Sequence, residues 1–388
     1  HTRAELGGGP ANFNEYVRHA RATLPGFALD KHKHFRSLGE MLQAVFMHYQ
    51  TRGAQTDPRL VRSTDAESMF HRAPTGASEV DPTGGGFLVQ VDFASAIFMA
   101  AHAMGEVLSR VNKIQISANA NGLKVPGVNE TSRATGSRWG GVQSYWAAEG
   151  STVTASKPTF RLVEFDLKKL FSTMYTTDEL LQDTSALTSI AGQAFSEEIM
   201  FMTEDAIIEG SGAGQPLGIL GAAATVSVAK ETGQGAATIV KENIDKMRMR
   251  MWSRSRPNAV WFINQDIEPQ LQSLSQVVGT GGAPVYLPPG GYRDAPNAML
   301  FGRPVVPVEY CPTLGTVGDI ILADLSQYTL VDKNGVQSAT SMHVAFLTDE
   351  MVFRITYRVD GKPMWNSPLT PFKGSNTTSP FVTLATRA

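Results

Sequence analysis

One group of residues has the type and spacing of a ligand-binding loop, the glycine-rich run from Gly210 to Gly218. A phosphate-binding loop needs Lys-Ser or Lys-Thr at its end, because these side chains reach the phosphates and the magnesium ion. Here Gln215, Pro216 and Leu217 stand in that part of the run, and the pattern before it predicts a helix rather than a strand. We therefore interpret the run as a turn-rich structural hinge.

Two further groups contain side chains that could bind a metal or transfer a proton. His32 and His34 could share a metal if the segment were extended, but Lys31 and Lys33 beside them would repel a cation. The acidic pairs Glu197-Glu198 and Glu204-Asp205 lie seven residues apart on a predicted helix, which is typical of a solvated face. The sequence thus predicts no catalytic residue, no cofactor site and no metal site.

Composition excludes several other classes of protein. The 388 residues include 34 basic and 36 acidic side chains, for a formal net charge of −2, whereas a surface that grips nucleic acid reads strongly basic. The one cysteine, Cys311, cannot form an intramolecular disulfide, which fits a reducing interior. No apolar run approaches the roughly 20 residues that span a bilayer, and we expect no secretory signal peptide after His1.

Hydrophobic periodicity predicts a mixture of helices and strands. A long helix is expected at residues 185–208, with Gly210 ending it. Shorter helices are expected at residues 94–108, 239–252 and 265–274. Strands are expected at residues 87–91, 111–116, 160–175, 260–264, 303–308, 319–323, 328–331 and 352–359. Because these elements follow no steady βαβ rhythm, the predicted fold class is α+β.

Two segments are hard to accommodate in a compact monomer. Residues 35–49 form an amphipathic helix between loose segments, so its apolar face, with Phe35, Leu38 and Leu42, is expected to dock on another subunit. Residues 119–158 are long, polar and glycine-rich, yet they carry the large aromatic residues that usually seek burial. These aromatic residues are Trp139, Tyr145 and Trp146. A projecting hairpin that buries them on a neighbouring subunit explains both properties, and packing on the chain's own body is the alternative.

Taken in order, several motifs resemble those of the HK97-type major capsid proteins of tailed bacteriophages. The first are Phe35-Arg-Ser-Leu-Gly-Glu40, Thr83-Gly-Gly-Gly-Phe-Leu-Val89, Trp146-Ala-Ala-Glu149 and Ser156-Lys-Pro-Thr-Phe160. They are followed by Glu179-Leu-Leu-Gln-Asp183, Ala206-Ile-Ile-Glu-Gly-Ser-Gly212 and Gln215-Pro-Leu-Gly-Ile-Leu220. The last are Trp261-Phe-Ile-Asn264, Leu300-Phe-Gly-Arg-Pro-Val-Val306 and Gly318-Asp-Ile-Ile-Leu-Ala-Asp324.

The resemblance implies an HK97-like fold with four parts: an N-terminal arm, an extended loop called the E-loop, a P-domain with a long spine helix, and an A-domain. The implied ranges are 1–117 for the arm and lead-in, 118–160 for the E-loop, 161–216 for the P-domain, and 217–332 for the A-domain. Residues 333–354 would return to the P-domain, and residues 355–388 would close the A-domain and form the tail.

The resemblance also implies a function without catalysis. Copies of the chain would form pentamers and hexamers of an icosahedral virion head, assembled in the bacterial cytoplasm around double-stranded DNA. A portal, and scaffolding or decoration proteins, would be the other partners. An encapsulin-like compartment shell is the alternative. Some relatives join subunits through an E-loop lysine and a neighbour's asparagine, but here Gly150 stands at the lysine position and Thr348-Asp349 at the later strand. We therefore expect no covalent cross-link.

Overall fold

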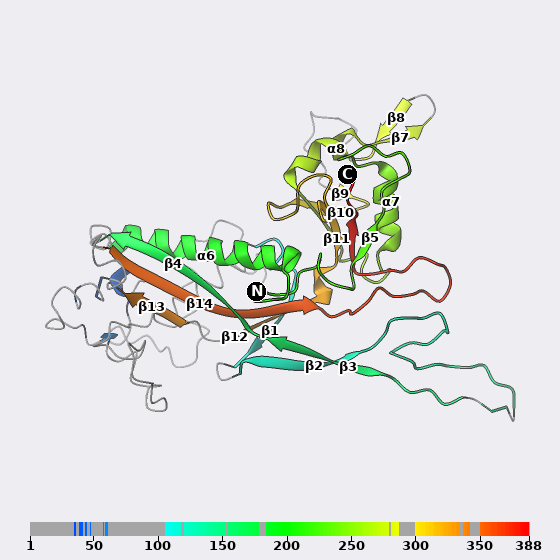
Figure 1. Ribbon diagram of the computed structural model, residues 1–388, viewed down its shortest axis with the longest axis horizontal. Coiled ribbons are helices and arrows are strands. Elements are labelled where there is room, and N and C mark those ends of the chain that lie inside the picture. The colour runs from blue at the N-terminus through cyan, green and yellow to red at the C-terminus, as the bar shows by residue number, and fades with distance from the viewer. Residues whose placement is uncertain are drawn as a thin grey trace.

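The computed structural model has two units and a projecting hairpin (Figure 1). It describes residues 105–117, 120–149, 151–152, 154–177, 184–278, 281–286, 299–333, 337–341 and 350–387. It also describes Phe35, Gly39–Met41, Gln43, Ala44, Met47, Asp57, Arg59 and Leu60. The first unit is a long sheet with one helix along it, and the second unit stands beside one end of that sheet.

The first unit is a five-stranded sheet whose central strand is β14, Glu350–Pro363. Strand β4 (Lys168–Thr177) pairs with it antiparallel over ten residue pairs, from Glu350 with Thr177 to Val359 with Lys168. On its other side β14 pairs with β13 (Gln337–Ser341) and then with β12 (Tyr328–Lys333). Strand β1 (Asn112–Ile116) completes the sheet, parallel to β12.

Helix α6, Thr184–Glu209, lies along this sheet over β4 and β14 (Figure 1). Alternate residues of β14, Phe353, Ile355 and Tyr357, are buried in one cluster with Phe195 and Ile199 of the helix. Because side chains alternate across a strand, this alternation identifies the helix-covered face of β14. At about 1.5 Å per residue the 26 residues of α6 extend roughly 39 Å.

The second unit is a six-stranded mixed sheet in the order β5-β15-β11-β6-β10-β9. The strands are β5 (Val226–Val228), β6 (Val260–Ile263), β9 (Met299–Leu300), β10 (Arg303–Pro307), β11 (Ile320–Ala323) and β15 (Phe381–Leu384). All four residues of β11 are buried. Ile320 and Leu322 belong to one core cluster, and Ile321 and Ala323 belong to the other. The sheet is therefore covered on both faces.

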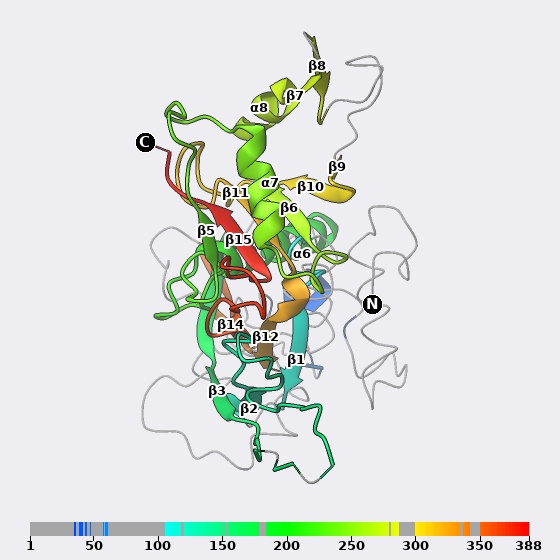
Figure 2. The same ribbon diagram turned by 90° about the vertical axis from the view of Figure 1, so that its right-hand side faces the viewer.

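Short helices and a small hairpin complete the second unit. Helix α7 (Lys241–Arg250) contacts β5 and β15 on one face of the sheet (Figure 2). The 3₁₀ turn η3 (Gln265–Ile267) leads directly into α8 (Glu268–Ser273). Strands β7 (Ser275–Val278) and β8 (Gly281–Pro284) form the hairpin that follows. The 3₁₀ turn η5 (Leu325–Gln327) connects β11 to β12 and so joins the two units.

The projecting hairpin is built on β2 (Gly122–Val128) and β3 (Phe160–Asp166). The two strands pair antiparallel through seven residue pairs, from Gly122 with Asp166 to Val128 with Phe160. The segment between them extends away from both units (Figure 1).

Most of the expected elements are confirmed. The predicted helix at residues 185–208 is α6, and β1, β3, β4, β6, β10, β11, β12 and β14 correspond to expected strands. The helix expected at residues 265–274 divides into η3 and α8. Gly105 to Leu108 form a turn instead of the expected helix end. The strand at residues 122–128 lies in the segment where a projecting hairpin was expected, whereas the strands at residues 226–228, 275–278, 281–284, 299–300, 337–341 and 381–384 were not expected.

The sheets divide the chain differently from the expected ranges at two points. Strand β12 lies in the first unit because it pairs with β1 and β14, although residues up to 332 were assigned to the A-domain. Strand β14 also belongs to the first unit along its whole length, beyond residue 354. Both differences follow from strand pairing, which the sequence pattern does not reveal. The domain ranges themselves remain a proposal.

The expectation that the helix near Phe35 has no partner inside the chain is wrong for two of its residues. The side chains of Phe35 and Met41 are 3% and 1% exposed and belong to the core cluster that the first unit shares with one face of the second sheet. The guanidinium of Arg59 lies 4.4 Å from the centre of the Phe35 ring. The strand expected at residues 87–91 falls outside the described residues, as do His32, His34, Leu38, Leu42, Gly150 and Thr348-Asp349.

Candidate assembly surface

The end of the β2–β3 hairpin exposes large aromatic side chains. Trp146 is fully exposed at 106%, Trp139 is 68% exposed, and Tyr145 is 46% exposed. Trp139 has a φ of 52° and is followed by Gly140 and Gly141, with φ of 71° and 134°. This left-handed turn holds the Trp139 side chain outward. A monomer gains nothing from ordering such side chains in water, so the surface is suited to burial against another molecule.

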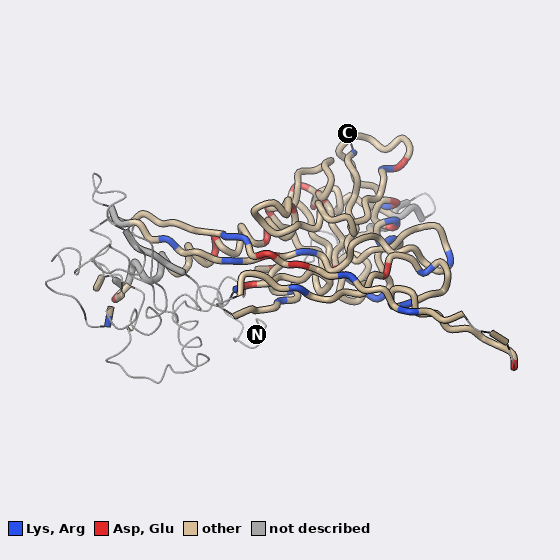
Figure 3. The backbone as a smooth tube through the Cα atoms, turned by 60° about the horizontal axis from the view of Figure 1, so that its bottom comes forward, with Lys and Arg blue, Asp and Glu red and all other residues tan. Residues whose placement is uncertain are grey.

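The hairpin end also carries almost no charge. Glu149 is the one charged residue among the 18 that separate Arg138 from Lys157. Figure 3 shows this part of the tube nearly free of basic and acidic positions, with an acidic position at its tip. Interface cores are depleted of charged residues and enriched in aromatic ones. The composition of the hairpin end therefore fits a protein–protein contact better than a nucleic-acid contact.

A second group of exposed apolar side chains lies on β3 and β4. Phe160 and Leu162 of β3, two residues apart, are 67% and 56% exposed. Phe171 and Tyr175 of β4, four residues apart, are also exposed and lie on one face of the strand. That face is opposite the one that packs against α6, because the neighbouring residue Met174 packs into the core with α6. These side chains offer a second surface on which another subunit could pack.

Three of the six predicted contact residues, Trp139, Tyr145 and Trp146, lie in the segment between β2 and β3 and are exposed to solvent, which argues against packing on the chain's own body. Trp139 stands near the end of the strand pair, because the next residue, Gly140, accepts the N–H of Thr159 at 3.0 Å. Phe35 is corrected, because its side chain is already buried in this subunit. For Leu38 and Leu42, outside the described residues, intersubunit contact stays a prediction.

A buried carboxylate joins three parts of the chain. Glu204 of α6 is 1% exposed, and its Oε1 accepts hydrogen bonds from the backbone N–H groups of Val107 (2.8 Å) and Leu108 (2.7 Å). Its Oε2 accepts the hydroxyl hydrogen of Tyr310. A side chain at Gly105 would overlap Oε1. The interpretation of Glu204 as part of a solvated face is therefore wrong.

Burial governs the ionisation of this group. Desolvation raises the pKa of Glu204 above its ordinary value, and the three hydrogen bonds reduce that shift. Burial, together with the neighbouring Glu204 carboxylate, raises the pKa of Tyr310 well above the ordinary value of a phenol, so this hydroxyl remains a donor. The hydrogen bonds of Glu204 join helix α6 to the turn at residues 105–108 and to Tyr310.

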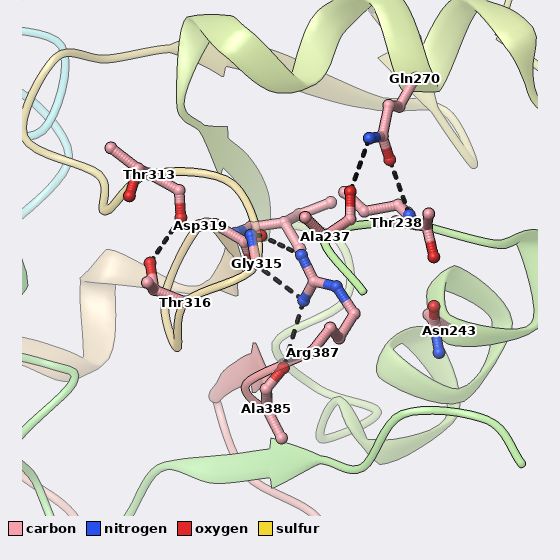
Figure 4. Close-up of polar contacts among 12 residues, drawn as sticks. Ala237, Thr238, Asn243, Gln270, Thr313, Gly315, Thr316, Asp319, Ala385 and Arg387 are labelled. Atoms are coloured by element: carbon pink, nitrogen blue, oxygen red, sulfur yellow. Dashed lines mark hydrogen bonds and ion pairs between the residues drawn. The ribbon is translucent and has the colours of Figure 1, made fainter. Parts of the chain in front are cut away.

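A buried ion pair lies in the second unit (Figure 4). Arg387 and Asp319 form an ion pair in which both side chains are 0% exposed. The Asp319 carboxylate also accepts the backbone N–H groups of Gly315 and Ile320, both at 2.9 Å. Arg387 donates a further hydrogen bond to the carbonyl of Ala385 at 3.2 Å. The pair connects the segment after β15 to the turn before β11.

The glycine-rich run after α6 folds on itself. The N–H groups of Gly210, Gly212 and Gly218 donate to the carbonyls of Ala206, Pro216 and Gly210. Leu217 is bound on both sides, since its N–H donates to Gly361 and its carbonyl accepts the Tyr328 hydroxyl at 3.0 Å. Backbone groups that are used in this way cannot bind phosphate. The run connects α6 to the second unit.

Other kinds of site were considered over the part of the chain that the structure describes. In these residues no three His, Cys, Asp or Glu side chains gather closely enough to hold a metal ion. None of the helices described here has the length and apolarity needed to cross a bilayer. Cys311 is buried, and burial raises the pKa of its thiol.

Glu204, Asp319 and Arg387 were not singled out from the sequence. Glu204 lies beside Asp205 and seven residues after Glu197, a pattern typical of a solvated face, and its burial depends on the turn at residues 105–108, about a hundred positions earlier. The sequence weakly indicates a structural role for Asp319, because this residue follows Gly318 at the start of a predicted strand. Nothing in the sequence pairs it with Arg387.

The comparisons with solved structures identify the fold. The capsid of an empty GTA particle is 16% identical, with a TM-score of 0.54, and the match covers 73% of this chain and 90% of the other. The capsid of a native GTA particle is 15% identical, with the same TM-score, and the match covers 83% and 98%. At this identity the similarity shows the fold alone, which is the HK97-like fold of capsid shell proteins. A search of curated protein sequences found no match.

The sequence itself identifies the family. Residues 85–374 match the model of the phage capsid family, a stretch that includes the hairpin and every described strand of both sheets except β15. The chain belongs to the phage capsid family, so it is a structural component of a virion shell.

Proposed function

We propose that this chain is the major capsid protein of a tailed bacteriophage. Copies assemble into pentamers and hexamers, and these form the icosahedral head that encloses double-stranded DNA. Assembly takes place in the cytoplasm of the bacterial host. The chain catalyses no reaction, and its contribution is the free energy of many intersubunit contacts.

The observation that carries this proposal is the projecting hairpin. Trp139, Tyr145 and Trp146 stand in solvent at the end of a two-stranded ribbon that reaches away from its own subunit. Aromatic residues dominate the binding energy of protein interfaces once they are desolvated. We infer that they anchor each subunit on a neighbour, with the exposed Phe171 and Tyr175 of β4 offering a surface of matching character.

Other features support the finer parts of the proposal. The two GTA capsids were computed with C5 symmetry, which favours five-fold rings for a chain of the same fold. A formal net charge of −2 suits a wall that faces DNA without binding it tightly. A portal closes one vertex, and scaffolding or decoration proteins act on the same shell.

Expression of the full chain, followed by size-exclusion chromatography and electron microscopy, tests the proposal. We expect closed particles in the void volume, with rings of five and six subunits. Particles isolated from a phage infection should protect double-stranded DNA from nuclease. A chain that remains monomeric under all assembly conditions would refute the proposal. Particles that hold a protein cargo and no DNA would support the encapsulin-like alternative instead.

We further propose that mature particles contain no covalent link between subunits. Gly150 cannot form the isopeptide bond that a lysine forms in some relatives. Boiled particles should give one band at the mass of the single chain, 41.9 kDa, on a denaturing gel. A ladder of dimers and larger oligomers that survives reduction would contradict this expectation.

A further inference from the structure

The hairpin stem is held by the end of β14 and the residue after it. The Asp166 N–H donates to Asp360 Oδ2 at 2.9 Å. The Lys362 ammonium donates to the carbonyl of Glu164. The Arg161 guanidinium donates to the carbonyl of Met364. These contacts fix the base of the stem, but none of them reaches the loop that carries the exposed aromatic residues.

The chain that follows β14 makes the next contacts with the hairpin. Leu369 and Thr378 exchange two backbone hydrogen bonds, of 2.8 and 2.9 Å, and close a loop between them. Within this loop Thr370 pairs with the hairpin, donating to the carbonyl of Thr131 at 3.1 Å and accepting the N–H of Arg133 at 2.8 Å. The closed loop therefore supports the hairpin beyond the end of β2.

The other end of the same loop is joined to helix α7 of the second unit. The Ser379 N–H donates to the carbonyl of Arg250 at 3.0 Å, and its carbonyl accepts the N–H of Trp252 at 2.9 Å. The Arg250 guanidinium donates to the Thr377 carbonyl and hydroxyl oxygens at 2.5 and 2.7 Å. Ahead of the loop, the indole of Trp365 packs edge-on against that of Trp252, with ring centres 4.9 Å apart.

Residues 364–379, here termed the brace, therefore contact the hairpin on one side and the end of α7 on the other. The contacts run through backbone pairs in sequence, from Ser132 with Thr370 to Leu369 with Thr378 and Ser379 with Met251. These isolated bridges connect the hairpin to the end of α7 through paired backbone groups. Figure 1 shows the corresponding segment between the second unit and the base of the projecting loop.

We propose that the brace sets the direction of the hairpin relative to the second unit, with Arg250 as the residue that positions it. A shift of α7 would then move the aromatic residues at the hairpin end. The proposal rests on the function proposed above, in which those residues contact a neighbouring subunit. It adds a route by which contacts of the second unit influence where the hairpin docks.

Hydrogen–deuterium exchange on the full-chain subunit tests the brace. The substitution is made at Arg250, where the brace meets α7, and the exchange rate is measured at the Arg133 amide, where the brace meets the hairpin. Arg250→Met removes both hydrogen bonds to Thr377 and keeps the length of the side chain. Exchange of the Arg133 amide should then accelerate roughly threefold to tenfold, as expected for the loss of one or two hydrogen bonds of support. Arg250→Lys, which can still reach the Thr377 carbonyl, should restore part of the protection.

Arg248→Met is the matched control. Arg248 is an exposed arginine on the same helix, and its guanidinium stacks on the Phe301 ring at 4.2 Å instead of contacting the brace. This variant should leave exchange at Arg133 unchanged. The proposal is overturned if Arg250→Met accelerates exchange at Ser379 while Arg133 keeps its original rate. It is also overturned if exchange accelerates equally in the core strand β11, since Arg250 would then stabilise the whole fold.

Failure of the brace and failure of the proposed function give different results. The exchange experiment uses the subunit alone and needs no particle. If the unaltered chain forms no particles, the proposed function fails whatever Arg133 shows. If particles form and Arg133 is unaffected by Arg250→Met, the brace alone is wrong.

Discussion

Replacing Asp319 by asparagine is expected to destabilise the second unit strongly. In the unaltered chain the carboxylate accepts two backbone N–H groups at 2.9 Å and pairs with the guanidinium of Arg387, with both side chains 0% exposed. The asparagine amide retains one acceptor oxygen, but its NH₂ group must face either the guanidinium or a backbone N–H. Arg387 is left as a buried charge without a counter-ion.

The size of the effect follows from the completeness of burial. Removing one partner of a buried ion pair costs about 3–5 kcal/mol, because the remaining charge is not compensated. For a unit of about 150–250 residues, this corresponds to a melting temperature lower by roughly 6–20 °C. Replacing both partners by apolar side chains of similar size is often neutral or stabilising. The double variant Asp319→Asn/Arg387→Met removes both charges and keeps an acceptor oxygen for a backbone N–H group, so it should melt closer to the unaltered chain than Asp319→Asn alone.

Differential scanning calorimetry of the purified subunit measures these differences. The exposed pair of Lys124 and Glu164 on the hairpin stem provides the control, since its side chains are 66% and 51% exposed. Glu164→Gln should not change the melting temperature measurably, because water and salt screen such a pair. A fall of less than about 2 °C for Asp319→Asn would refute the reasoning. So would a double variant whose loss equals the sum of the two single losses.

Four further outcomes are expected. Trp146→Ser should reduce particle yield without changing the melting temperature of the subunit, because this side chain has no contact to lose within it; equal particle yields would count against the hairpin contact. Glu204→Ala should cost about 2–6 kcal/mol in urea unfolding, since two buried N–H groups lose their acceptor, whereas Glu204→Gln keeps that acceptor. Because the pKa of Glu204 is raised in the folded state, the folded chain binds the proton more tightly, and stability falls as pH rises above 4.5. In Glu204→Gln this part of the pH dependence of the unfolding free energy should be absent. If the unfolding free energy of this variant changes between pH 4.5 and 7 as much as that of the unaltered chain, the linkage to Glu204 is contradicted. Gly210→Ala should destabilise by about 1–3 kcal/mol or more, because the new Cβ overlaps the carbonyls of Ala206 and Pro216. Gly235→Ala, where the nearest atoms lie at ordinary contact distance, should be neutral or slightly stabilising in the same assay.

The parts of the fold that the sequence predicts are those set by local pattern. The helix at residues 185–208 and the strands at residues 260–263 and 320–323 carry continuous apolar signals that are bounded by turns. The strand at residues 226–228 is only three residues long, and β15 pairs with strands more than fifty positions away. Hydrophobic periodicity carries no information on which strands pair. For the same reason, the sequence did not reveal that β12 and the whole of β14 belong to the sheet of the first unit.

The exposed aromatic residues could be predicted from the sequence, whereas the buried polar groups could not. Trp139, Tyr145 and Trp146 could be predicted, because large aromatic residues in a long polar segment need a partner outside it. Phe35 was assigned to an interface because its predicted helix had no visible partner in the sequence, whereas its side chain is buried in the core cluster of this chain. Glu204 could not be recognised as buried, because its acceptor role depends on amides of residues 107 and 108 that only the fold brings near.

The position of β15 in the second sheet has a consequence for biosynthesis. This strand lies between β5 and β11, so residues 381–384 complete the middle of a sheet whose other strands are all made earlier (Figure 2). Ribosomes add about 5–20 residues per second, and a nascent chain that lacks its last strand leaves two strand edges open. The sheet of the second unit therefore cannot close until residues 381–384 have been made, because β5 and β11 gain their shared neighbour only then.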